Sequence, residues 1–158
     1  MLVGHIGFIA WATRRDLDII RKLAPEQITR ELVSSFPSIL ATLQHLYQGN
    51  VWWFSRMRGD PVSWEQISIP QSFAELDANW QKLFDEMAAW AKSRTRKQWS
   101  ITVTNPNTKK TDPLWQAVMH LSNHDSYHRG QLTTLIRQVG GTPTNTDLIN
   151  FYREAFKP

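Results

Sequence analysis

The sequence predicts an all-α protein folded as an antiparallel four-helix bundle, and three observations carry this prediction. Four long segments place apolar residues three and four positions apart, the period of a helix with one buried face. Proline and glycine interrupt the period between these segments, and the connections are short. The chain has 158 residues without an internal repeat, so we expect a single domain spanning 1–158 that buries about 70% of its unfolded surface.

Proline and glycine delimit the first two predicted helices. The first is expected from about 7 to 23, where an Ala-Pro pair ends its apolar stripe and a polar connection follows. The second is expected to begin near Ser34-Ser35, with Pro37 in its first turn, where a missing N–H costs little. It should end before Gly59, which stands at a turn signal.

The third predicted helix begins after Ser72, whose hydroxyl can cap it with Glu75 three residues later. It should run to about 94. The segment 98–104 alternates polar and apolar residues and is rich in β-branched side chains, and an Asn-Pro turn signal follows at 105–108. We therefore expect a short strand, hairpin or loop over one end of the bundle.

A fourth long helix is predicted after this segment. Thr111 or Asp112 would cap it, with Pro113 at its first position, and Gly-Gly-Thr-Pro would end it near 139. A last short helix is expected from about 147.

Composition narrows the classes of function. The chain has no cysteine, which excludes disulfides and thiolate chemistry of its own and suits a reducing cytoplasm. We expect no signal peptide and no membrane span, because charged residues interrupt every apolar run. A net charge of +4 permits nucleic-acid binding, but the basic residues are scattered, which favours a solvated surface instead.

The fourth helix carries three histidines, His120, His124 and His128, each four residues from the next. Residues four apart share a helix face, so two imidazoles can grip one ion, but three span about 12 Å, too far for one small cation. Helical angles of about 100° per residue place His124 and His128 in the apolar sector, and His120 at its border. We expect the first two to be ligands and His120 to line the mouth of the site.

The alternative is that these are core histidines satisfied by hydrogen bonds. A shared ion is favoured because two adjacent buried imidazoles must each be neutral and paired. A third ligand should come from another helix, and His45 is the one histidine in the second. The small Gly49 nearby indicates that something approaches the backbone closely, either a bound group or another helix at a tight crossing. Trp52 would line the pocket in the first case and the helix interface in the second.

Polar residues around these histidines are candidates for supporting roles. Gln131 faces the site best by helical angle, either as pocket lining or as a core hydrogen-bonding group. Asn123 and Asp125 point about 100° to either side of His124, which is typical of surface or capping residues, so they are weak candidates for contact with a ligand.

The segment Asn123-His-Asp-Ser-Tyr-His-Arg-Gly-Gln131 resembles the NHxxxHRGQ signature of the DinB/YfiT-like superfamily. Further similarities, in the expected order, are Ala10-Trp-Ala12, Ser38 to His45, Trp52-Trp53, Gly59, Gly140 and Thr146-Asp147. The resemblance implies an up-down-down-up bundle, usually dimeric, that holds a divalent metal with His45, His124 and His128. Related branches include transferases that use a small thiol, and a maleylpyruvate isomerase.

Together the residues and the resemblance predict a metal-dependent enzyme acting on a small molecule, as a small-thiol S-transferase or a hydrolase. The expected cofactors are a divalent ion, zinc or nickel, and a low-molecular-weight thiol. The alternative is a metal-binding stress or scaffold protein without turnover. A nucleic-acid-binding protein is the least favoured class.

Overall fold

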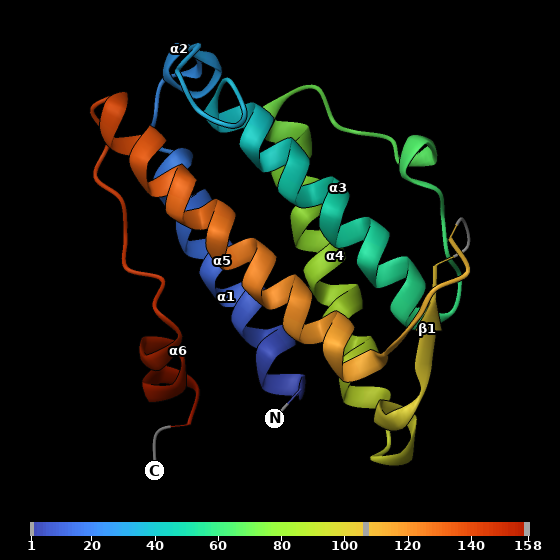
Figure 1. The fold of residues 1–158 in the computed structure, drawn as a ribbon. Helices are drawn as coiled ribbons and strands as arrows, with labels where there is room; N and C mark the ends of the chain where they lie inside the picture. Colours follow the sequence, from blue (N-terminus) through green and yellow to red (C-terminus); the bar gives the residue numbers. More distant parts are fainter. Residues whose placement is uncertain (1, 106–107, 157–158) are drawn as a thin grey trace.

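The computed structural model describes residues 2–105 and 108–156, and long helices dominate this part of the chain (Figure 1). Helices α1 and α3 each pack against both α4 and α5, so the four close into a bundle. The bundle helices are α1 (Leu2–Ile20), α3 (Ile39–Arg58), α4 (Phe73–Ser93) and α5 (Leu114–Gln138). The shorter elements are α2 (Pro25–Thr29), α6 (Leu148–Ala155) and two 3-10 turns, Trp64–Gln66 and Lys97–Ser100.

A small antiparallel sheet stands before α5, where the sequence predicts a strand or hairpin. It consists of β1 (Thr102–Thr104) and β2 (Thr111–Pro113). Positions 106 and 107 of the expected turn lie outside the described residues. The helical bundle is therefore confirmed, with this sheet added, while the up-down-down-up order and the single domain stay predictions.

The predicted start of the second long helix is wrong by about four residues. Ser38 caps α3, because its Oγ accepts a hydrogen bond from the Ala41 backbone N–H at 3.0 Å. Residues 33–38 form bends, with the Leu32 N–H bonded to the Pro37 carbonyl. Proline disfavours the helical conformation in the residue before it, so Pro37 keeps Phe36 outside the helix.

The other helix ends differ in smaller ways. The first helix begins earlier than expected and ends at Ile20, and a helical turn replaces the expected polar connection. Ser72 caps α4 as predicted, accepting from the Glu75 N–H at 3.2 Å. Pro113 precedes the first residue of α5 instead of occupying it, and no side chain caps that end, because Thr111 and Asp112 pair in β2.

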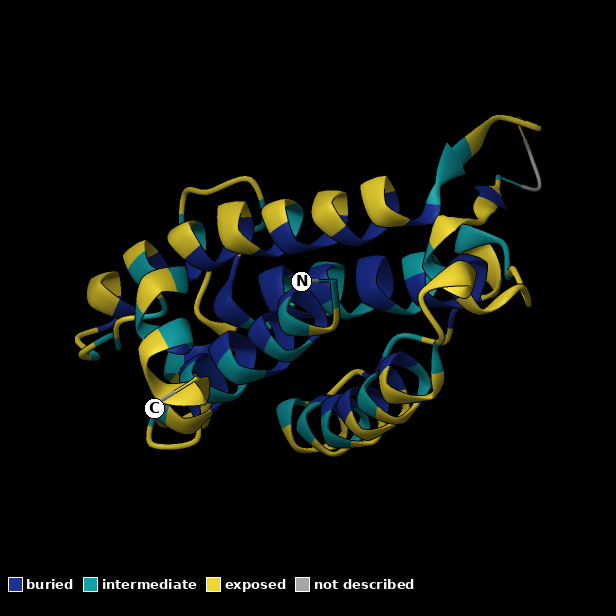
Figure 2. Cartoon of the chain, turned by 90° about the horizontal axis from the view of Figure 1, so that it is seen from below, coloured by how far each residue is buried: buried dark blue, intermediate teal, exposed yellow. Residues whose placement is uncertain are grey.

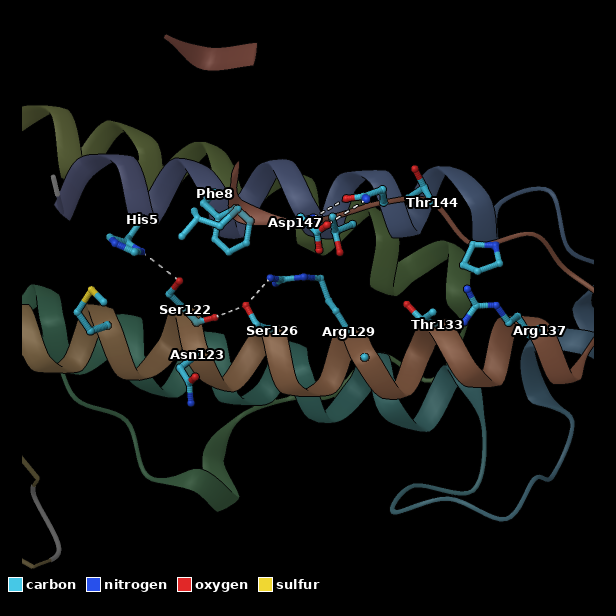
Figure 3. A pocket seen from close by; sticks show the side chains of 16 residues that line it. His5, Phe8, Ser122, Asn123, Ser126, Arg129, Thr133, Arg137, Thr144 and Asp147 are labelled. Carbon is cyan, nitrogen blue, oxygen red and sulfur yellow. Dashed lines mark hydrogen bonds between the residues drawn. The ribbon is translucent and has the colours of Figure 1, made fainter. Parts of the chain in front are cut away.

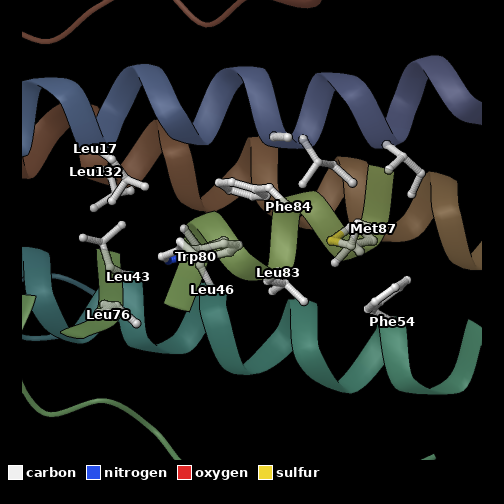
Figure 4. Close-up of a cluster of buried hydrophobic side chains, with 14 of the residues drawn as sticks. Leu17, Leu43, Leu46, Phe54, Leu76, Trp80, Leu83, Phe84, Met87 and Leu132 are labelled. Carbon is white, nitrogen blue, oxygen red and sulfur yellow. The ribbon is translucent and has the colours of Figure 1, made fainter. Parts of the chain in front are cut away.

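The core lies between the four long helices, where their buried faces meet (Figure 2). Trp80 and Phe84 of α4 stack at 4.9 Å and are almost wholly buried, with leucines of α1, α3 and α5 around them (Figure 4). Among the described residues, none of the helices has the length and apolar character needed to cross a membrane. The packed faces of α3 and α5 bring His45 close to His124 and His128.

Candidate metal centre

Helices α3 and α5 bring three histidines into one cluster. His45, His124 and His128 each offer a ring nitrogen, and these nitrogens all lie within 4.8 Å of one another. The ring centroids of His124 and His128, one helical turn apart on α5, are 4.5 Å apart, and the His45 ring lies 5.3 Å from that of His124 and 4.6 Å from that of His128. An ion at the centre of such a triangle would contact all three imidazoles.

Gly49 makes room for this arrangement. It lies one turn after His45 on α3 and is buried, and a Cβ added to it would lie only 3.2 Å from His124 Cε1. The close approach expected at this glycine is thus the imidazole of His124. Any larger residue would push that ring away from His45.

Asp125 supports His124, a role for which the sequence made it only a weak candidate. Its carboxylate is fully buried, lies 3.3 Å from His124 Nδ1 and accepts hydrogen bonds from Asn50 Nδ2 at 3.0 Å. Helical angle alone gave this role little support, because Asn50 reaches Asp125 from another helix, α3. A carboxylate on Nδ1 orients the ring and leaves Nε2 as the metal-binding atom.

His128 and His45 are held by different neighbours. Gln131 Oε1 lies 2.7 Å from His128 Nδ1, and Gln131 Nε2 donates to Ser35 Oγ at 3.0 Å. The ring of Phe36 stacks on His45 with centroids 4.2 Å apart. Gln131 thus faces the cluster as its helical angle predicts, and the bent segment before α3 fixes two of the three histidines.

Burial and mutual proximity favour the neutral form of His45 and His128. Desolvation, followed by the positive charge that His128 and His124 can carry, lowers the pKa of His45 to about 4. Desolvation also lowers the pKa of His128, against the opposing effect of the Gln131 hydrogen bond. Neutral imidazoles are the form that binds a metal, so these two rings are ready to accept an ion near neutral pH.

His120 and Trp52 lie beside the cluster and outside it. His120 is exposed, and its ring is 6.1 Å from that of His124 and 4.7 Å from that of Trp53. Trp52 is half-buried and reaches His45 only through Trp64, whose ring is 6.1 Å from each of them. Both predicted lining residues therefore belong to the surroundings of the three histidines.

The opposite face of α5 borders a separate polar groove of about 750 Å³ (Figure 3). Asn123, Ser126 and Arg129 line it, facing α1 and the segment before α6. Arg129 donates to Ser126 Oγ at 2.7 Å and is almost wholly buried. The predicted signature segment thus has two sides: its histidines, Asp125 and Gln131 lie toward α3 and the bend before it, and Ser126 and Arg129 lie toward this groove.

Sequence reasoning missed two contributors to the site. Phe36 was expected inside the second helix, and the only signal against that was Pro37 after it. Asn50 lies five residues after His45 and follows the glycine, but nothing in the local pattern connects it to Asp125, 75 residues later.

Known proteins resemble this chain in sequence and in fold. The DinB family model matches residues 6–156. The protein named DinB of Bacillus subtilis strain 168 is 25% identical over 147 residues, covering 87% of this chain and 85% of that protein.

Two solved structures share the fold. YfiT from Bacillus subtilis, described as a probable metal-dependent hydrolase with an unusual four-helix bundle topology, has a TM-score of 0.67 at 15% identity and 86% coverage of each chain. A DinB-like protein from Bacillus cereus has the same TM-score at 20% identity, covering 85% of this chain and 90% of that one.

Proposed function

Because the chain belongs to the DinB family, we propose that it is a metal-dependent enzyme that acts on a small molecule, with His45, His124 and His128 as the metal ligands. The observation that carries this proposal is the convergence of three ring nitrogens within 4.8 Å. Three histidines without a fourth protein ligand are typical of catalytic zinc sites, which keep one position open.

The surroundings fit an ion of this kind. Asp125 and Gln131 hold the Nδ1 atoms of His124 and His128, so both rings present Nε2 to the cluster. The His124 side chain keeps 22% of its surface exposed, which leaves the site reachable from solvent. A bound divalent ion would supply a Lewis acid that lowers the pKa of a water or thiol beside it.

Two reaction classes fit the site. Hydrolysis is supported by the description of YfiT as a probable metal-dependent hydrolase, and transfer of a small thiol is supported by the family resemblance. Zinc or nickel suits three imidazole ligands. The homodimer and the thiol co-substrate are proposals that rest on the same resemblance, and the cytoplasmic location is a proposal that rests on the lack of cysteine in the sequence.

The test is metal analysis of protein purified without chelators. We expect about one divalent ion per chain, and loss of that ion in His45→Ala and His128→Ala. His120→Ala is the matched control, because this histidine lies outside the cluster and should leave the metal content unchanged. Native protein without an ion, or equal content in all variants, would contradict the proposal.

A metal-binding protein without turnover is the second candidate. It would bind the ion but show no open coordination position. Cobalt-substituted protein separates the two, because an exogenous ligand such as a hydroxamate changes the cobalt absorption spectrum only if such a position exists.

A further inference from the structure

Six aromatic rings form a closed circuit that includes two of the three clustered histidines. Around it, neighbouring ring centroids lie between 4.7 and 6.1 Å apart. The rings, in order, are those of His45, Trp64, Trp52, Trp53, His120 and His124. We refer to this set as the aromatic circuit. Its members come from α3, from α5 and from the 3-10 turn between α3 and α4.

The circuit adjoins the proposed metal ligands. On α3, Gly49 lies one turn from His45 and one turn from Trp52 and Trp53, and the His124 ring packs against it, so the histidine cluster and these two tryptophans share one stretch of the helix. The three tryptophans are half-buried and His120 is exposed. Ring surface beside the histidines is therefore open to solvent.

A cationic side chain lies against the tryptophans of the circuit, while the Asp125 carboxylate lies 3.3 Å from His124 Nδ1. Arg56 lies over the rings of Trp52 and Trp53, 4.6 and 4.5 Å from their centroids, and its side chain is almost wholly buried. The carboxylate of its partner Asp112 lies 3.5 Å from Arg56 Nη2 and is partly exposed, so water screens its negative charge. A guanidinium behind the rings and a divalent ion beside them both attract negative charge.

Resting on the proposed function, we propose that the aromatic circuit makes the site selective for aromatic compounds that carry an anionic metal-binding group. Trp64 and Trp52 are the specificity-determining side chains. Trp64 is the tryptophan that neighbours a proposed metal ligand directly, and it stands on a connection outside the long helices. An aromatic ring stacked or edge-on against these indoles gains both burial and quadrupole interaction.

The experiment compares benzohydroxamate with acetohydroxamate on the full chain loaded with Co²⁺, by titration of the cobalt absorption spectrum. The two probes share the metal-binding group and differ in the aromatic ring. We expect native protein to bind benzohydroxamate about tenfold more tightly. Trp64→Ala and Trp52→Ala should each bring the ratio of the two affinities close to one, with unchanged affinity for acetohydroxamate. Trp64→Phe should keep most of the preference for benzohydroxamate.

Trp115→Ala is the matched control. Trp115 is 49% exposed and lies nine residues from His124, about 180° around α5, so its loss should not change the ratio. An unchanged cobalt spectrum shows that each variant is folded at the site. Equal affinity for the two probes in native protein, or a preference that survives in both tryptophan variants, overturns the inference and leaves the metal centre intact. Absence of a cobalt spectrum in native protein overturns the proposed function and this inference with it.

Discussion

At the scale of single residues, Gly49 combines two opposing requirements. A glycine inside a helix costs up to about 1 kcal/mol relative to alanine, yet a Cβ here would lie 3.2 Å from His124 Cε1. We expect Gly49→Ala to weaken metal binding by about tenfold, because the His124 ring must move out of ligand geometry. Isothermal titration calorimetry with Zn²⁺ measures this change.

Gly130 on α5 provides the control for that substitution. A Cβ added to Gly130 meets no heavy atom within 4 Å, so Gly130→Ala should raise the free energy of unfolding by up to about 1 kcal/mol without changing metal affinity. If Gly49→Ala binds zinc as tightly as native protein, the close approach of His124 has no role in the site.

Asp125 is expected to act on the metal through His124. Asp125→Asn keeps the shape of the side chain but replaces the carboxylate that orients the His124 ring. Loss of such a partner typically costs ten- to hundredfold in metal affinity, so we expect about tenfold or more. Asn123→Ala, on the other side of His124, is exposed and should change affinity little. Competition with a chromophoric chelator measures both, and equal affinities would rule out this role.

At the scale of elements, the start of α3 gives a prediction that separates two candidate caps. Ser38 accepts a hydrogen bond from the Ala41 N–H, so Ser38→Ala should lower the free energy of unfolding by about 1 kcal/mol. Ser34, the start expected from sequence, is exposed and precedes the helix. Ser34→Ala should therefore stay within about 0.5 kcal/mol of native protein. Urea denaturation compares them, and the reverse order would place the cap at Ser34.

The same element shows what the sequence can and cannot predict. The helical period correctly groups His124 and His128, because both belong to one helix and share one face of it. It makes Asp125 only a weak candidate for supporting His124, since a side chain from α3 decides that residue's burial. It also extends α3 too far, because Phe36 is apolar at helical spacing but packs on His45 from a bend. Contacts between elements depend on tertiary packing, and the spacing of residues within one helix does not show which other element will pack against it.

At the scale of the whole molecule, the metal centre joins α3 to α5, so an ion bound there should stabilise the fold. Zinc at a concentration of about 100 times its Kd should add about 2.7 kcal/mol to the free energy of unfolding. For a chain of this size, that raises the Tm by about 5–10 °C. We expect chelation to remove this increment. His45→Ala provides the contrast, because its Tm should not respond to zinc, and an equal response by calorimetry would place the ion elsewhere.

Asp16 makes the stability of the whole molecule depend on pH. Its carboxyl is 1% exposed, and neither oxygen has a hydrogen-bond partner among the described residues. Desolvation raises its pKa from 3.8 to about 7, although Arg129 opposes this rise. At a pH between these two pKa values, Asp16 is protonated in the folded protein and ionised in the unfolded chain. The contribution of Asp16 to the free energy of unfolding therefore falls as pH rises from about 4 to about 7.

Asp16→Asn removes this dependence while keeping the size of the side chain. A tenfold change in the proton affinity of the carboxyl corresponds to about 1.4 kcal/mol, so the variant should gain up to about 4 kcal/mol over native protein at pH 8, and much less at pH 5. Urea denaturation of metal-free protein at both pH values measures the difference. The lowered pKa values of the histidines affect native protein and Asp16→Asn equally, so their effect cancels in the difference between the two free energies of unfolding. Asp18→Asn, exposed on the same helix, should show no such trend. A gain or loss for Asp16→Asn that is the same at both pH values would mean that Asp16 is ionised throughout and paired with Arg129.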